Sequence, residues 1–161
     1  MAAPPAFSLR SVHPEDAPWL WELKIAALRT YVELTWGEWN EPQQRAFFER
    51  GFTPQTLRII TIENEGDAGV LELARRGSEF FITRLELLPR FQRRGIGSAI
   101  IQGIQLEAGL ANKPVRLQVL RVNPARLLYR KLGFTEVGET STHVLMSWFA
   151  ARQNSLASPP D

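Results

Sequence analysis

The chain has 161 residues, of which 44% are hydrophobic and 22% are charged, a length and composition typical of one globular domain. It contains no cysteine and only two histidines, which excludes a disulfide framework, a thiolate nucleophile and a cysteine-containing zinc site, and predicts no metal. The net charge of +2 is too small to indicate nucleic-acid binding, and no stretch is apolar enough to predict a membrane span.

We expect a single domain over residues 1–150, followed by a flexible C-terminal tail over residues 151–161 that is small, polar and rich in proline. The first residues lack the basic stretch and apolar core of a secretory signal. Together with the absence of cysteine, this predicts a cytoplasmic protein.

The first half of the chain predicts a strand, two helices and a three-stranded meander. A strand at Phe7–Val12 precedes a helix over Pro14–Val32, which starts with proline and acids and repeats apolar residues at helical spacing. A short helix is predicted at Pro42–Glu49. Three strands separated by turns follow, at Leu57–Ile62, Val70–Leu73 and Phe80–Leu88.

The second half alternates helices and strands. Isoleucines four residues apart predict a helix over Ile96–Leu110, followed by a strand at Val115–Leu120 and a helix at Pro124–Leu132. Two strands, Phe134–Val137 and Val144–Trp148, close the chain. Three consecutive strands followed by this alternation predict a mixed α/β (α+β) fold with a parallel crossover in its second half.

A basic turn joins the third strand of the meander to the next helix, over Leu85–Ser98. Helix N-termini expose unpaired N–H groups and bind phosphates, and Gly95 and Gly97 let a ligand approach the backbone closely. Nearby arginines add positive charge: Arg90, Arg93 and Arg94. The segment therefore predicts a pyrophosphate-binding turn.

Two nucleotide-binding motifs fit this turn poorly. A dinucleotide fingerprint needs a third glycine where the chain has Ile100, and an acid about 20 residues further on, where the strand Val115–Leu120 has none. A P-loop needs a lysine before its Ser or Thr, and here Gly97 precedes Ser98 directly.

Two segments resemble the GNAT superfamily of acyl-CoA-dependent N-acyltransferases. Gln92–Gly97 resembles the Gln/Arg-x-x-Gly-x-Gly/Ala signature of that family. One helix and one strand later, Asn123–Phe134 resembles its Asn-x-x-Ala-x-x-Leu-Tyr-x-x-x-Gly-Phe block, shortened here to Asn-Pro-Ala. The resemblance implies a mixed, splayed sheet of about seven strands with helices on both faces. It also implies direct transfer of an acetyl group from acetyl-CoA to a primary amine of a small molecule or peptide.

The resemblance also implies how acetyl-CoA is held. Its pyrophosphate is expected on the helix start, and the amides of its arm on the exposed backbone of the preceding strand, at Leu85, Leu87 and Leu88. The residues expected to contact the coenzyme are Leu87, Leu88, Gln92, Arg93, Arg94, Gly95, Ile96, Gly97, Ser98, Asn123, Arg126 and Tyr129.

The expected catalytic residues are Tyr129 and Glu86. Tyr129 lies where the family often places its general acid, and a phenol is protonated at neutral pH. Glu86 is the first candidate for the base that keeps the amine neutral, with Glu72 and Glu33 as alternatives. Gln118, near the position of a family glutamate, cannot serve as a base. Purely structural roles for Tyr129 and Glu86 stay open.

The segment Tyr31–Trp39 is expected to join the first two helices and to wall the acceptor pocket. Tyr31, Glu33 and Trp36 are the expected substrate-binding residues, because aromatic rings and carboxylates hold cationic amines, although core packing is the alternative. The implied partners are acetyl-CoA and an amine acceptor, and the resemblance allows a homodimer. The rival functions are a non-catalytic acyl-CoA-binding or regulatory module of the same fold and a nucleotide-binding domain.

Overall fold

The computed structural model describes residues 3–151, so the tail predicted over 151–161 lies, apart from Ala151, outside the described residues. Along residues 3–151, no helix combines the length and apolarity needed to cross a membrane. The strands are β1 (Phe7–Ser11), β2 (Leu57–Ile62), β3 (Gly66–Arg75), β4 (Phe80–Leu87), β5 (Val115–Leu120), β6 (Thr135–Glu139) and β7 (His143–Trp148). The helices are α1 (Ala17–Trp36), α2 (Glu41–Arg50), α3 (Ile96–Leu110) and α4 (Ala125–Lys131), with the 3₁₀ turns η1 (Pro14–Asp16) and η2 (Pro89–Phe91).

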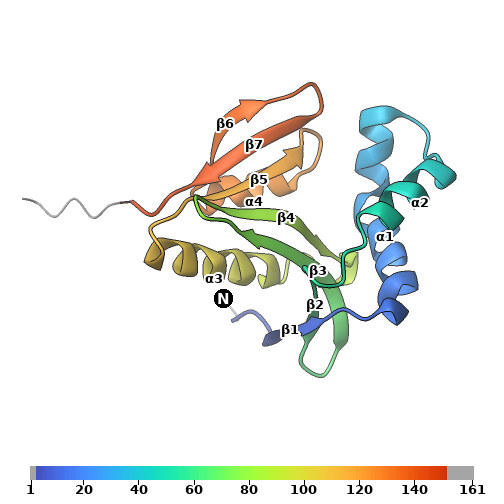
Figure 1. Ribbon diagram of the computed structural model, residues 1–161, viewed down its shortest axis with the longest axis horizontal. Coiled ribbons are helices and arrows are strands. Elements are labelled where there is room, and N and C mark those ends of the chain that lie inside the picture. The colour runs from blue at the N-terminus through green and yellow to red at the C-terminus, as the bar shows by residue number, and fades with distance from the viewer. Residues whose placement is uncertain (1–2, 152–161) are drawn as a thin grey trace, which may run out of the picture.

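The strands form one seven-stranded sheet in the order β1-β2-β3-β4-β5-β7-β6 (Figure 1). Neighbours are antiparallel except β4 and β5, which are parallel because α3 carries the chain back across the sheet. This topology confirms the mixed α/β fold predicted from the sequence, including the parallel crossover.

Helices cover both faces of the sheet, with α1 and α2 on one side and α3 on the other (Figure 1). Strand β2 shows why, because its apolar side chains alternate between two cores. Leu57 and Ile59 pack with the α1 and α2 residues, whereas Ile60 and Ile62 pack with the isoleucines of α3 and with α4. A sheet buried on both faces holds its central strands firmly, which gives the site between them a fixed frame.

The helix α1 runs four residues further than predicted. The sequence analysis ended it at Val32 and treated Tyr31–Trp39 as a connection, and this is wrong because the helix continues to Trp36. In its last turn the Gly37 N–H donates to the Glu33 carbonyl over 2.9 Å, and the Thr35 hydroxyl donates to the Tyr31 carbonyl over 2.7 Å. The helix stops at Gly37, whose φ of 92° only glycine adopts readily.

Strand β3 is also longer than predicted, covering Gly66–Arg75 rather than Val70–Leu73. Its polar ends do not alternate with apolar residues, so periodicity misses them. They are held in the strand by pairing with both neighbours, β2 and β4.

Candidate active site

The sheet opens between its two central parallel strands. Strands β4 and β5 pair only where Phe80–Ile82 faces Val115–Leu117. Beyond this register β4 continues to Leu87 and β5 to Leu120. The splay leaves one edge of β4 turned towards a gap rather than towards a neighbouring strand.

A β-bulge at Thr83 determines which side chains face the two layers of helices. Ile82 is paired with β3 before the bulge and Arg84 after it, so Thr83 is an extra residue and the alternation of side chains reverses there. Leu85 and Leu87 therefore join the α3 core on the same face as Ile82. Glu86 lies on the opposite side of the strand, towards α1, as its alternation with Leu85 and Leu87 predicted.

The end of β4 has some backbone groups open and others engaged. The side-chain amide of Gln92 donates to the Leu87 carbonyl over 2.9 Å, so Gln92 tethers the turn to the strand. The N–H of Leu88 donates to the Ala68 carbonyl, and the Leu88 carbonyl accepts from the Phe91 N–H, each over 2.9 Å. Both backbone groups of Leu88 thus already have partners within the protein, and a contact between Leu88 and the coenzyme arm stays a prediction.

The start of α3 is a bare helix N-terminus. Arg93 and Gly95 adopt positive φ angles of 60° and 81°, which turn the chain sharply from the strand into the helix. Gly95 is the N-cap, and no side chain caps the helix there. The first-turn N–H groups at Ile96, Gly97 and Ser98 are thus available to an anion, and the helix dipole adds partial positive charge.

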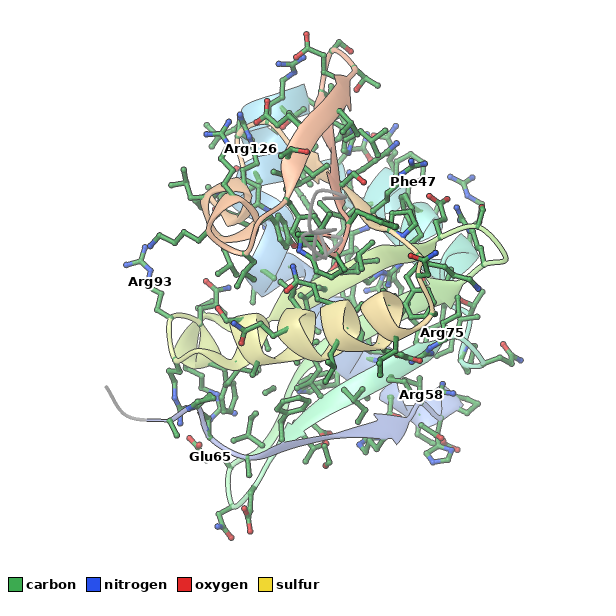
Figure 2. The ribbon with its side chains drawn as sticks, turned by 90° about the vertical axis from the view of Figure 1, so that its left-hand side faces the viewer. Phe47, Arg58, Glu65, Arg75, Arg93 and Arg126 are labelled. Atoms are coloured by element: carbon green, nitrogen blue, oxygen red, sulfur yellow. The ribbon has the colours of Figure 1, made fainter. Side chains whose placement is uncertain are left out.

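The arginines predicted to surround the pyrophosphate differ in whether they are already paired within the protein. Arg94 forms a two-point ion pair with Glu65, with its shorter contact at 2.7 Å. Figure 2 shows the Arg93 side chain extending away from the start of α3 into solvent. Arg126 pairs with Glu136 over 2.9 Å and donates to the Arg121 carbonyl. Although its side chain extends outwards, Arg93 lines the smaller cavity, so it and the backbone N–H groups are the anion donors that this helix start offers.

Tyr129 is held in place by the end of its own helix. The N–H of Phe134 bonds to the Tyr129 carbonyl over 3.0 Å, and Gly133 takes a φ of 92° to allow it. The Tyr129 ring packs on Phe134, with the ring centroids 5.7 Å apart. Only 8% of Tyr129 is exposed, and burial raises the pKa of its phenol to about 12. The hydroxyl is therefore a proton-bearing donor at neutral pH.

Glu86 is the buried carboxylate of the site. Its side chain is 10% exposed, and its Oε1 lies 4.0 Å from Arg84 Nε. Burial raises the pKa of the Glu86 carboxyl, and the charges of Arg84 and Lys24 oppose that rise. A carboxyl whose pKa is raised is a stronger base for an incoming ammonium group than an ordinary glutamate.

The alternative bases lie elsewhere. Glu72 is buried, and its Oε2 accepts hydrogen bonds from the hydroxyls of Thr53 and Thr56, so it fixes the loop after α2. Glu33 pairs with Arg29 over 2.7 Å along α1. Neither is among the described residues that line the cavities of the gap.

Two cavities meet in the gap between β4 and β5. The smaller, about 420 Å³, opens at the start of α3 and reaches α4. The larger, about 780 Å³, lies between α1, α2 and the two strands. The residues that line both cavities are Leu28, Leu85, Glu86, Asn123 and Tyr129. The proposed acid and base thus lie on the wall shared by a phosphate-side cavity and an acceptor-side cavity.

Asn123 connects α4 to this shared wall. Its side-chain oxygen accepts from the Ala125 N–H over 2.9 Å and so caps the start of α4. The amide nitrogen is then a donor for a ligand.

The three residues predicted to bind the acceptor, Tyr31, Glu33 and Trp36, do not line the same cavity. Trp36 lines the larger cavity and lies beside His143, with ring centroids 6.1 Å apart. Tyr31 lines the smaller cavity instead, so it lies on the coenzyme side. Glu33 is turned towards Arg29, as described above. Among these three residues only Trp36 lines the larger cavity, and their role in binding an acceptor stays a prediction.

Sequence reasoning missed several residues of the larger cavity, namely Lys24, Phe47 and Arg84. One signal was available for Lys24, which sits four residues after Leu20 and four before Leu28 on the apolar face of α1. A lone lysine on an apolar helix face indicates a charge directed into a cleft. Among the described residues, no group of three or more histidines, cysteines or acids is arranged to hold a metal ion.

The comparisons with known proteins agree with this geometry. Residues 55–136, just over half of the chain, match the family model described as acetyltransferase (GNAT) domain. A comparison with curated proteins finds no match.

Solved structures of similar fold cover most of the chain. PaiA N-acetyltransferase from Thermoplasma acidophilum in complex with coenzyme A has a TM-score of 0.69 at 16% identity, covering 89% of this chain and 99% of that one. An acetyltransferase from Thermus thermophilus has a TM-score of 0.66 at 20% identity, covering 89% and 97%. The ribosomal-protein-S18-alanine N-acetyltransferase from Escherichia coli has a TM-score of 0.60 at 18% identity, covering 89% and 94%. At these identities the likeness establishes the fold.

Proposed function

Because the chain belongs to the GNAT acetyltransferase family, we propose that it is an N-acetyltransferase that moves the acetyl group of acetyl-CoA to a primary amine of a small molecule or peptide. The observation that carries the proposal is the gap between β4 and β5. Its two cavities share Glu86 and Tyr129, and one of them opens on the uncapped start of α3.

The chemical groups of the coenzyme match the hydrogen-bonding groups that line the smaller cavity. A pyrophosphate suits the first-turn N–H groups of α3, and the amides of the arm suit the open edge of β4 at Leu85 and Leu87. Gln92, Asn123 and Tyr129 line the same cavity and offer polar side chains along the route. The solved coenzyme A complex of the Thermoplasma acidophilum protein, which has the same fold, supports this assignment.

The acceptor amine must lose a proton to become a nucleophile. An alkylamine with a pKa near 10.4 is mostly protonated at neutral pH, so a base in the cleft raises its reactive fraction. Glu86 takes this role, directly or through a water molecule. Because the pKa of the Glu86 carboxyl is raised, it lies closer to the pKa of the ammonium group, and proton transfer between the two is less unfavourable.

The transfer is a direct attack. The neutral amine nitrogen adds to the thioester carbonyl carbon and a C–N bond forms. As the C–S bond breaks, the nitrogen releases one proton to become the amide, and the sulfur leaves as a thiolate that takes up one proton. A backbone N–H on the open edge of β4 stabilises the oxyanion as it forms.

Tyr129 donates its hydroxyl hydrogen bond to the leaving sulfur. Full proton transfer from a phenol of pKa about 12 to a thiolate whose thiol has a pKa of about 8.5 costs roughly 5 kcal/mol. Tyr129 therefore contributes a hydrogen bond that stabilises the thiolate, and the proton that the thiolate finally takes up is the one released by the attacking nitrogen, relayed through the site or through water.

The test is an acetyl-CoA turnover assay with a panel of amines that records release of the free thiol. The proposal expects amine-dependent thiol release and an N-acetylated product of the matching mass. Acetyl-CoA binding with no turnover on any amine would instead support a non-catalytic acyl-CoA-binding module. A domain limited to residues 1–150, a cytoplasmic location and a homodimer stay predictions from the sequence.

A further inference from the structure

The larger cavity carries a charge pattern that acetyl transfer alone does not require. Lys24 enters it from α1 and Arg84 from β4, while Glu86 is the one carboxylate among the described residues that line it. Lys24 Nζ lies 3.4 Å from the carbonyl oxygen of Gln44, which is a long hydrogen bond. Arg84 Nε stays 4.0 Å from Glu86 Oε1, beyond hydrogen-bond range. Among the residues that line the cavity itself, cations therefore outnumber carboxylates, while Glu72, which pairs with Arg84 across the strands, contributes a negative charge behind this wall.

These cations are partly removed from water. The Arg84 side chain is 24% exposed, and burial lowers the pKa of Lys24 with a further contribution from the charge of Arg84. Charges in such a cleft are costly unless a partner compensates them. A cleft lined by one sign of charge also concentrates ligands of the opposite sign.

The rest of this cavity combines polar side chains, such as Gln43 and Gln118, with a continuous apolar part. Its walls come from α1, α2, β4 and β5 and include Leu28, Val32, Phe47, Phe48, Ile82 and Val119. A ligand that fills this volume therefore needs an apolar part beside its charged one.

We propose that the acetyl acceptor is a small amine that carries both a carboxylate and an apolar group, as an apolar amino acid does. This inference rests on the proposed acetyl transfer. The carboxylate pairs with Lys24 and Arg84, and the amino group is left beside Glu86. The arrangement reverses the expectation from the sequence that acids would hold a cationic amine.

The first test compares amines that differ by the carboxylate alone. L-phenylalanine is compared with phenethylamine, and L-leucine with 3-methylbutylamine, by thiol release from acetyl-CoA after correction for the unprotonated fraction of each amine. We expect kcat/KM to be at least about 10-fold higher for each amino acid, as for one charge-assisted contact. Equal or faster turnover of the plain amines would overturn the inference and leave the proposed function intact. If the protein preferred short peptides to the free amino acid, the inference that the acceptor is a small molecule would be overturned.

The second test removes the cations singly. Lys24→Gln and Arg84→Gln are expected to lower kcat/KM for phenylalanine by about 10- to 100-fold, mainly through KM. Phenethylamine turnover should change much less, since it has no carboxylate to lose a partner and responds only through the effect of these charges on the pKa of Glu86. The matched controls Lys131→Gln and Arg58→Gln remove the same charge at exposed positions and are expected to change neither substrate. An equal loss on both substrates would mean that the cations serve the fold or the coenzyme, and would reject the inference.

A binding measurement separates this inference from the proposed function. If acetyl-CoA binds and no amine is turned over, acetyl transfer is rejected. The anion preference is then measured with N-acetyl-L-phenylalanine against N-acetylphenethylamine on the protein saturated with coenzyme A. A larger rise of the unfolding midpoint with the acid supports the cation site, and equal shifts or none reject it.

Discussion

Glu86 and Tyr129 are both acids, and burial at the shared wall of the two cavities acts on them in the same direction. It raises the pKa of both groups, yet the consequences differ. The phenol, already protonated at neutral pH, stays a hydrogen-bond donor. The carboxyl moves towards the range in which it exchanges protons near neutrality, so the two side chains suit opposite steps of one transfer.

The first prediction concerns the Tyr129 hydroxyl. Tyr129→Phe is expected to lower kcat by about 100-fold or more, because the leaving thiolate loses its donor. The ring still packs on Phe134, so the unfolding midpoint and its rise with acetyl-CoA should be nearly unchanged. An unaltered kcat in steady-state assays would remove Tyr129 from the mechanism.

The second prediction concerns pH. A base works only when deprotonated, so activity falls as the pH drops through the pKa of Glu86. Because burial raises that pKa, the acid limb of kcat/KM should lie above the value of an ordinary glutamate, about 4.3. Glu86→Gln should abolish this limb and lower kcat/KM by about 100-fold.

The control for that pH profile is Glu22→Gln, at an exposed position of α1, which should keep both the rate and the limb. A wild-type acid limb at or below the value of an ordinary glutamate, about 4.3, or a Glu86→Gln profile with the same limb, would assign the proton transfer to another group or to water.

Residue roles were readable from the sequence where a local motif fixes them. Tyr129 belongs to a Leu-Tyr-x-x-x-Gly-Phe pattern, and that pattern builds its own helix end. The orientation of Arg84 depends on the extra residue at Thr83, which carries no sequence signature. The pairing of Arg94 with Glu65 depends on the packing of distant segments, so it too is visible only in the structure.

At the scale of elements, the end of α4 matters most because it positions Tyr129. Gly133 has a φ of 92°, and a Cβ added there would lie 3.2 Å from Trp148 Cδ1. Gly133→Ala is therefore expected to lower the free energy of unfolding by about 1–2 kcal/mol or more and to reduce kcat. Denaturant unfolding and steady-state kinetics on the same samples measure both effects.

Gly103→Ala is the matched control for that substitution. Gly103 is exposed within α3 and a Cβ there would meet nothing within 4 Å, so alanine should stabilise the helix by about 0.5–1 kcal/mol. If both variants changed stability in the same direction, the strained helix end would not be the cause.

Element boundaries were predictable where periodicity and flanking turns agree. The helix Ile96–Leu110 and the strand Val115–Leu120 have the bounds predicted from the sequence. The end of α1 was predicted wrongly because aromatic residues and a glycine near Trp36 resemble a connection. The turn stays helical up to Gly37, and this places Trp36 at the larger cavity.

For the whole molecule, bound acetyl-CoA should stabilise the fold by contacting both sides of the gap where β4 and β5 separate. Acetyl-CoA seated between β4 and β5 would join the α3 side to the α4 side of the gap. At 100 times its Kd it should add about 2.7 kcal/mol to the free energy of unfolding and raise the midpoint by about 5–11 °C. NAD and ATP at the same concentration should give no comparable shift. A larger shift with either nucleotide in differential scanning fluorimetry would favour the nucleotide-binding alternative.

The overall class followed from the order of the elements, since three strands followed by alternating helices and strands permit few topologies. The splay was implied by the family resemblance, whereas its position depends on where the β4–β5 register ends. The charge of the acceptor cavity was not predictable, because it combines residues from α1 and β4 that only the folded sheet brings together.

The most direct measurement is a crystal structure of the protein with bound coenzyme A. We expect the pyrophosphate oxygens within hydrogen-bond distance of the N–H groups at Ile96–Ser98, and the thiol end between β4 and β5 near Tyr129. A coenzyme bound elsewhere, or a helix start closed by side chains with the gap empty, would contradict the assignment of this gap as the site of acetyl transfer.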